Sequence, residues 1–308
     1  MSRVEAWDLC TVWGKETLRV KDRKWRVRYI RGLARKNWAA RRHYEQGRQG
    51  TTAVTTKVHP GRTRLSDKDF DFHRVGEPKY FYFVASTERS GSTHLCTKFW
   101  QTGILGAPHE YFNFNNTMLE MAARLGARSL NEYLRRLFEV RTSANGAFGA
   151  KMHWSHLQFL QLAKILPEFP TAQWIFADRR DSVAQAVSFA KAVQTQQWTS
   201  LAEPQAGSSY DFETVLSWYK QLMVDKESWR RFFESAEIQP VNVFYEDFIA
   251  RPDAIIADIV GKFGFPTEPR SQVVLPEISR QGDETNFEWV VKFMRDAEEQ
   301  GYRLPSSS

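Results

Sequence analysis

Residues 87–93, Thr-Glu-Arg-Ser-Gly-Ser-Thr, combine a permanent cation, several hydroxyl groups and a glycine. They follow an apolar, aromatic run over 80–86 that predicts a buried strand, and they precede a segment of helical character over 91–100. At such a turn the first N–H groups of the helix and its aligned peptide dipoles attract an anion. The loop therefore predicts a phosphate-type cradle, formed by Arg89, Ser90, Gly91, Ser92 and Thr93.

This cradle differs from the loop that binds nucleoside triphosphates. The pattern G-x-x-x-x-G-K-[ST] is absent, and Arg89 precedes Gly91 where a lysine would follow the glycine. Gly91 allows close approach of the backbone, and Arg89 can form paired hydrogen bonds to an anion. Taken alone, the segment also fits a serine-capped helix that follows a tight turn.

The elements around the loop alternate between strands and helices. Short apolar runs predict strands, and apolar residues at helical spacing predict the helices between them. We expect strands over 80–86, 147–152, 172–177 and 241–245, and helices over 91–100, 116–140, 154–166, 181–196 and 212–235. This alternation implies right-handed crossovers and an α/β fold, with a mostly parallel central sheet flanked by helices.

Positive charge is concentrated at the start of the chain. The 308 residues carry a net charge of +7, but residues 1–64 alone hold 17 Lys and Arg against 5 Asp and Glu. We interpret 1–64 as a basic helical N-terminal extension and linker, 78–300 as the main domain and 301–308 as a tail. Aromatic residues lie among the cations of the extension, a pattern compatible with nucleic acid, an anionic membrane surface or an acidic glycan. A solvated basic helix is the plainer interpretation.

Several classes of protein are disfavoured by composition. Two cysteines cannot build a disulfide framework, and the N-terminus lacks the apolar run of a secretory signal. No stretch approaches the roughly 18 apolar residues of a membrane span. We expect a cytoplasmic protein, with peripheral contact to the inner face of the membrane left open by the basic extension. The seven histidines show no metal-binding spacing, so no metal site is expected.

Several blocks of the chain together resemble the trehalose 2-sulfotransferase family, a group of bacterial carbohydrate sulfotransferases. These blocks are FVASTERSGSTHLC, TGILGAPHEYF, residues 178–198 and, more weakly, 280–296, and they occur in the family's order. The resemblance implies a P-loop-like sulfotransferase fold. It also implies transfer of a sulfuryl group from 3′-phosphoadenosine 5′-phosphosulfate (PAPS) to a hydroxyl of a carbohydrate or glycolipid.

The resemblance assigns the donor site to three regions. The cradle would hold the 5′-phosphosulfate, and Arg179 and Ser188 would hold the 3′-phosphate. Such a second anion clamp would lie across the crevice in which open α/β sheets bind ligands. Arg280 and Gln281 match a stretch that closes over the nucleotide. Each of these residues alone would also fit a structural role, Arg179 in a surface ion pair and Ser188 as a helix hydroxyl.

The acceptor side is expected around Glu110, which matches the family's proposed general base. His109 is the rival base and also a candidate contact to the acceptor. Lys151 and Trp154, in the block GAKMHW, resemble a family strand that reaches the site. Tyr111 and Trp154 are further candidate contacts to the acceptor, although a tryptophan at the start of a helix is more often part of the core. Glu88 departs from the family pattern, which has a neutral amide there near the acceptor sugar. This departure leaves the acceptor open, and a polysaccharide sugar or a glycolipid is at least as well supported as trehalose.

Two other functions remain open at this point. A kinase-like phosphotransferase would need a lysine in the loop and a Mg²⁺-binding aspartate, for which Asp178 and Asp181 are the candidates. A non-catalytic protein that binds through its basic extension would show salt-dependent binding. By analogy with phosphoryl transfer, sulfuryl transfer depends on positioning and charge stabilisation, and a sulfuryl group carries less charge than a terminal phosphoryl group, so no metal is required. The resemblance is also compatible with a homodimer.

Overall fold

A computed structural model describes residues 64–72, 77–114, 116–165, 169, 171–267, 274–278 and 282–304. They belong to the second of two units into which the chain divides, residues 63–308. The predicted extension lies outside the described residues except for Arg64, as do Arg280, Gln281 and the last four residues of the tail.

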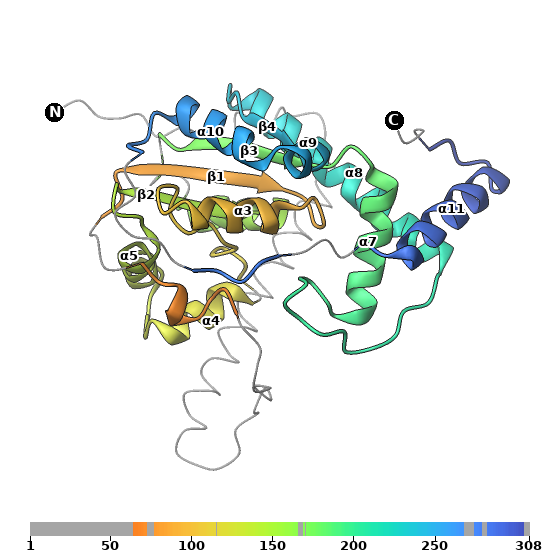
Figure 1. Ribbon diagram of the computed structural model, residues 1–308, viewed down its shortest axis with the longest axis horizontal. Coiled ribbons are helices and arrows are strands. Elements are labelled where there is room, and N and C mark those ends of the chain that lie inside the picture. Colours follow the sequence, from red (N-terminus) through yellow and green to blue (C-terminus); the bar gives the residue numbers. More distant parts are fainter. Residues whose placement is uncertain are drawn as a thin grey trace, which may run out of the picture. The chain divides into compact units, whose positions relative to one another are not determined.

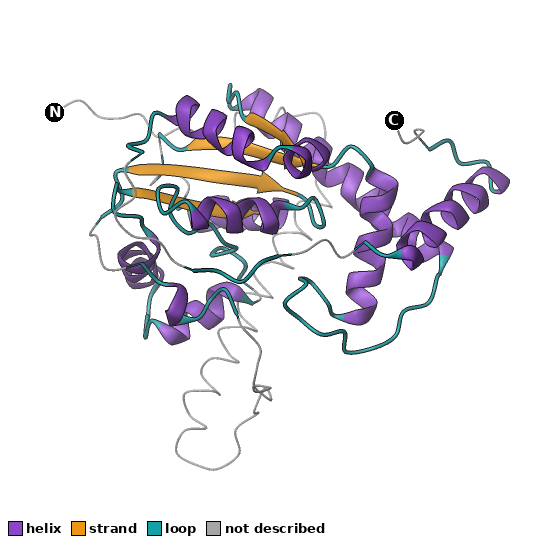
Figure 2. Cartoon of the chain, viewed as in Figure 1, coloured by secondary structure: helices purple, strands orange, loops and turns teal. Residues whose placement is uncertain are grey.

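Four parallel strands form the central sheet, in the order β2-β1-β3-β4 (Figures 1 and 2). Their bounds are Tyr80–Ser86 for β1, Ala147–Met152 for β2, Gln173–Asp178 for β3 and Val241–Phe244 for β4. All four strands lie within one residue of the predicted ranges, and the expected α/β fold with a parallel sheet is confirmed. In the register, Val84 of β1 pairs with Lys151 of β2 and Ile175 of β3.

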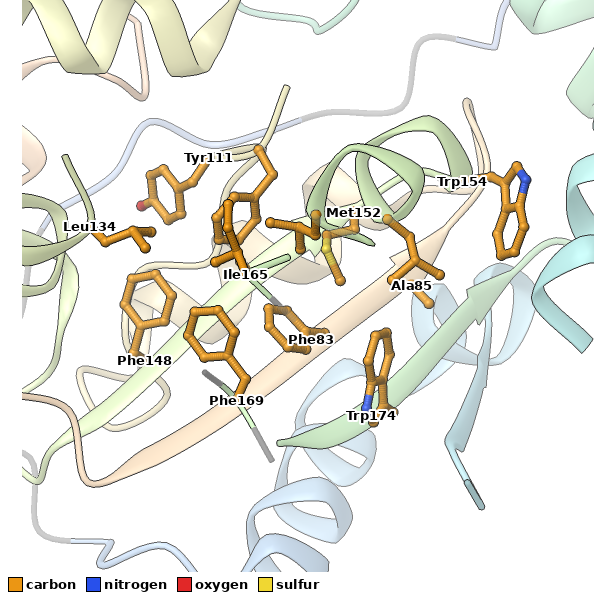
Figure 3. Close-up of a cluster of buried hydrophobic side chains, with 14 of the residues drawn as sticks. Phe83, Ala85, Tyr111, Leu134, Phe148, Met152, Trp154, Ile165, Phe169 and Trp174 are labelled. Atoms are coloured by element: carbon orange, nitrogen blue, oxygen red, sulfur yellow. The ribbon is translucent and has the colours of Figure 1, made fainter. Parts of the chain in front are cut away.

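Both faces of the sheet are buried, as alternate side chains of β1 show. Phe83 and Ala85 join a core that includes residues of α5, α6 and α8 (Figure 3), whereas Tyr82 and Val84 join a core with residues of α3 and α10. These helices span Ser92–Gln101 (α3), Leu130–Arg141 (α5), Trp154–Ala163 (α6), Phe212–Ser235 (α8) and Pro252–Phe263 (α10). Two-sided burial explains why β1 is apolar at nearly every position.

A third core joins α7, Ser182–Thr195, to α8 and to α11, Glu284–Glu299. Each of the three helices begins at an aspartate whose carboxylate accepts a hydrogen bond from a backbone N–H of the first turn. Figure 1 shows α7 and α11 on the side towards which β1 points. The carboxyl ends of the strands therefore face the α7 side.

The helical spacing predicted over 116–140 is confirmed and is divided between two helices, α4 at Thr117–Arg124 and α5. Gly126 has a φ of 67°, a left-handed conformation that ends the first helix. The Ser129 hydroxyl then accepts from the Glu132 N–H at 3.2 Å and starts α5. Helix α9, Tyr245–Ala250, directly follows β4.

Candidate active site

The loop between β1 and α3 is built around two left-handed residues, Arg89 at φ 60° and Gly91 at φ 80°. A Cβ on Gly91 would lie 2.3 Å from Cδ2 of the Tyr245 ring, which no side chain could occupy without displacing that ring. The glycine is therefore required by its conformation and by the tyrosine packed against it.

Residues on α7 and α8 hold the loop in place. The amide of Gln185, fully buried on α7, donates to Thr87 Oγ1 at 2.8 Å and to the Glu88 carbonyl at 2.6 Å. Trp229 of α8 donates its indole N–H to the Ser86 carbonyl at 3.1 Å. The loop is thus fixed by contacts from α7 and α8.

The start of α3 has the features of an anion site. Its N-cap, Gly91, provides no side-chain cap, so the first N–H groups of the helix lack a side-chain acceptor from that residue. Ser90 Oγ is buried and has no hydrogen-bond partner among the described residues. A bound anion would satisfy both sets of donors, so the residues present fit a phosphate or sulfate group.

Arg89 and Ser188, which the sequence placed on opposite sides of the donor site, are in contact. Arg89 Nε lies 3.0 Å from Ser188 Oγ on α7, and its Nη1 donates to the Trp198 carbonyl at 2.7 Å. Burial, followed by the charge of Arg179, lowers the pKa of Arg89 to about 10. Arg89 and Arg179 thus concentrate positive charge at the strand ends, while Arg89 still carries its proton at neutral pH.

Arg179 follows β3, and its guanidinium lies 5.1 Å from the centre of the Tyr245 ring. Lys226 of α8 is buried behind it, 2.6 Å from the Arg179 carbonyl, 3.0 Å from Ser182 Oγ and 2.7 Å from Asp178 Oδ1. Tyr245 thus contacts both the cradle and Arg179. Lys226 fixes the backbone from which Arg179 extends.

Glu110 lies in the loop after α3 and is held by two neighbours. Lys151 Nζ, on β2, is 2.7 Å from Glu110 Oε1 and 2.8 Å from Thr93 Oγ1 of the cradle. Asn113 donates its amide to Glu110 Oε2 at 2.9 Å. The N–H of Lys151 also donates to the His109 carbonyl at 3.0 Å, which ties the loop to β2.

The charge of Glu110 is set by these contacts. Burial raises the pKa of the carboxyl, but the Lys151 ammonium and His153 outweigh it and hold the pKa well below its ordinary value. His153 Nε2 lies 3.6 Å from Glu110 Oε1. Glu110 is therefore a carboxylate at neutral pH, as a proton acceptor must be.

Two residues predicted to contact the acceptor lie in the hydrophobic core instead (Figure 3). Tyr111 is fully buried and its hydroxyl donates to the Ala107 carbonyl. Trp154 packs edge-on against Trp229 at 5.3 Å between ring centres. Their large apolar area is used in packing, which favours a role in the core over contact with the acceptor.

His109 and Glu88 remain near the site. Burial lowers the pKa of His109 to about 3, so this histidine is neutral and a much weaker base than an ordinary histidine. The Glu88 carboxylate acts electrostatically on His153.

Several residues of this site received no role from the sequence, among them His153, Gln185, Lys226 and Tyr245. Lys151 was matched to a family strand that reaches the site, and its place in the apolar run AFGAKM is a second signal, because a buried ammonium needs a nearby anion. Within the described part of the chain, no group of three or more His, Cys, Asp or Glu could hold a metal ion. The described helices include none long and apolar enough to cross a membrane.

Comparison with known proteins agrees with the geometry. The Stf0 sulphotransferase family matches residues 81–296. Trehalose 2-sulfotransferase of Mycolicibacterium smegmatis is 28% identical over 263 residues, which cover 72% of this chain and 97% of that protein. The enzyme of the same name from Mycobacterium tuberculosis is 26% identical, covering 70% and 95%.

Among solved structures, a sulfotransferase from Alicyclobacillus acidocaldarius aligns with a TM-score of 0.43 at 15% identity, covering 75% of this chain and 98% of that one. The sulfotransferase domain of the Synechococcus PCC 7002 olefin synthase aligns with a TM-score of 0.38 at 16% identity, covering 75% and 97%. The family match spans most of the chain and contains the cradle, Glu110, Lys151 and Arg179. The chain belongs to the Stf0 sulphotransferase family.

Proposed function

We propose that the protein transfers a sulfuryl group from PAPS to a hydroxyl of a carbohydrate or glycolipid, with Glu110 as general base. One observation carries the proposal: Lys151 contacts both the cradle, through Thr93, and Glu110. A donor anion at the cradle and an acceptor hydroxyl at Glu110 would therefore both lie beside the Lys151 ammonium group.

The donor would occupy two anion sites. The α3 N-terminus, Ser90 and Arg89 would hold the 5′-phosphosulfate, and Arg179 with Ser188 would hold the 3′-phosphate. When bound, PAPS supplies a sulfuryl group on a labile S–O bond. Arg280 and Gln281 stay predictions, because they lie outside the described residues.

The chain's own groups would carry the acceptor's proton and the developing charge. Glu110, already ionised, would take the proton of the attacking hydroxyl as the new O–S bond forms. Lys151 lies beside Thr93 and would offset negative charge on the departing phosphate and on the sulfuryl oxygens, an electrostatic role that is strongest where water is excluded.

The name of the two relatives, trehalose 2-sulfotransferase, supports a sugar acceptor. The carboxylate of Glu88 beside the site favours an acceptor other than trehalose. The homodimer, the contact of residues 1–64 with a membrane surface or anionic glycan, and the cytoplasmic location stay predictions.

The kinase-like alternative is disfavoured by the two aspartates it would use for Mg²⁺. Asp178 is paired with the buried Lys226 at 2.7 Å, and Asp181 accepts the Ala184 N–H at 2.8 Å as the cap of α7. Both carboxylates already have structural partners.

Calorimetric titration with 3′-phosphoadenosine 5′-phosphate, the desulfated donor, tests the proposal, with ATP as the control ligand. Tight binding of the desulfated donor and much weaker binding of ATP would support it, and a screen of sugars with labelled PAPS would then identify the acceptor. No binding, or a preference for ATP, would contradict it.

A further inference from the structure

His153 lies just beyond β2, at the N-cap of α6, and is nearly buried beside Glu110. Its two ring nitrogens face different partners. Nδ1 is 3.2 Å from the Ser86 carbonyl oxygen and 3.3 Å from Ser86 Oγ, whereas Nε2 is 3.6 Å from Glu110 Oε1. The ring therefore connects the end of β1 to the proposed base.

The contact with Ser86 favours a proton on Nδ1. The Ser86 carbonyl oxygen can only accept, and it already accepts the Trp229 indole N–H at 3.1 Å. Nδ1 donates to this oxygen in the tautomer that keeps the 3.2 Å contact. In that neutral tautomer the lone pair is on Nε2, the atom 3.6 Å from Glu110 Oε1.

Charged and titratable groups face His153 from each neighbouring element. Glu88 comes from the loop after β1, Glu110 from the loop after α3, Lys151 from β2 and His156 from α6. Burial lowers the pKa of His153, but the carboxylates of Glu88 and Glu110 raise it, and the pKa lies above its ordinary value of 6.5. His156 differs, since burial and the neighbouring His153 lower its pKa to about 3.

We propose that His153 is a positioning residue for Glu110 and that its neutral imidazole receives, at Nε2, the proton that Glu110 takes from the acceptor hydroxyl. This inference rests on the proposed function. The proton passes from the hydroxyl to Glu110 and then to His153, while the hydroxyl oxygen bonds to sulfur and the S–O electron pair leaves with the phosphate. The imidazolium then releases its proton to water.

A relay of this kind makes turnover depend on pH in a defined direction. The imidazolium has no lone pair, so it cannot relieve Glu110 of a proton. Below the pKa of His153, kcat should fall about tenfold per pH unit, and above it kcat should be level. We call this fall of kcat at low pH the acid limb. Glu110 itself ionises well below this range, so it does not produce the acid limb.

The pH profile of kcat for His153→Gln tests the relay, because the glutamine amide can still donate towards Glu110 but cannot titrate. We expect kcat to fall about tenfold and the acid limb to disappear. His156→Gln is the matched control: the replaced histidine is neutral throughout, so this variant should keep the limb. An unchanged limb in His153→Gln would overturn the proposal.

Glu88→Gln adds a second test that leaves the relay atoms in place. Loss of that carboxylate should move the acid limb of kcat to lower pH, and an unmoved limb counts against the proposal. Should His153→Gln fail to fold, an NMR titration of the His153 imidazole in the wild-type protein tests the relay without a measurement of turnover. His153 must titrate above its ordinary pKa of 6.5 in the wild-type protein and at lower pH in Glu88→Gln, or the relay is wrong.

The two proposals fail in different ways. Absence of binding of 3′-phosphoadenosine 5′-phosphate by the wild-type protein would contradict the sulfotransferase function itself. Normal binding and turnover, with a pH profile that His153→Gln does not alter, would contradict only the role of His153.

Discussion

Lys151 Nζ and Glu110 Oε1 lie 2.7 Å apart at the centre of the site, and the lysine side chain is only 3% exposed. A buried ammonium is stable only beside an anion. The pairing has two effects here. It holds Glu110 ionised, and through the 2.8 Å contact with Thr93 it ties the proposed base to the donor cradle.

Replacing Lys151 with methionine should abolish turnover and destabilise the fold. The variant leaves the Glu110 carboxylate without its main partner, and breaking a buried pair costs about 3–5 kcal/mol, less here because Glu110 is 21% exposed. Chemical denaturation of Lys151→Met, Glu110→Gln and the double variant measures the coupling between them. The double variant should be more stable than Lys151→Met, and simple additivity would show that the pair is not coupled.

Gly91→Ala should damage the cradle. The added Cβ would lie 2.3 Å from the Tyr245 ring and the backbone has a φ of 80°, so both the loop and the tyrosine must move. We expect a loss of more than about 1 kcal/mol in the free energy of unfolding and weaker binding of 3′-phosphoadenosine 5′-phosphate. Differential scanning calorimetry with and without this ligand measures both.

Gly261→Ala provides the matched control, because Gly261 is on α10 and a Cβ added there would meet no neighbouring atom within 4 Å. This substitution should leave ligand binding unchanged and stabilise the helix by up to about 1 kcal/mol. Equal behaviour of the two alanine variants would mean that Gly91 has no special role.

Arg179→Ala should weaken the binding of 3′-phosphoadenosine 5′-phosphate far more than the binding of adenosine 5′-phosphate, which lacks the 3′-phosphate. A hydrogen bond to a charged group contributes about 1.5–3 kcal/mol, so we expect a loss of roughly 10- to 100-fold in affinity for the first ligand. Calorimetry of both ligands provides the comparison, and equal losses for the two would remove Arg179 from the 3′-phosphate site.

The adjacent Arg180→Ala is the control for charge. Arg180 pairs with Asp247 at 2.7 Å on the surface and packs on the Phe244 ring at 4.2 Å. Removal of Arg180 changes the net charge by the same amount, but it should change the affinities for the two ligands equally.

The strands and the turn after β1 were predictable because their signals are local. An apolar run such as 80–86 indicates its own burial, and a glycine among hydroxyl residues after such a run indicates a tight turn before a helix. The sheet rule that parallel strands end at one edge predicted that Arg89 and Arg179 lie on the same side, whereas their roles in donor binding came from the family resemblance.

The contacts of Lys151 and His153 with Glu110 were not predictable from the sequence. Lys151 and His153 lie more than 40 residues further along the chain, and only the parallel pairing of β1 with β2 brings them to the cradle and the loop after α3. Tyr111 and Trp154 show the opposite limit, because an aromatic side chain that a local motif places beside a site can equally complete the core beneath it.

Trp154→Phe separates packing from sugar binding. Trp154 lies in the core between Trp229 and Phe232, at 5.3 and 6.4 Å between ring centres, so the smaller ring should leave a void and destabilise the fold by about 1–3 kcal/mol. The KM for the acceptor should be unchanged, because the indole is packed in the core. Trp198→Ala is the control, since this tryptophan is 44% exposed and its removal should alter stability by less than about 1 kcal/mol. A raised KM in Trp154→Phe with wild-type stability would instead make Trp154 an acceptor contact.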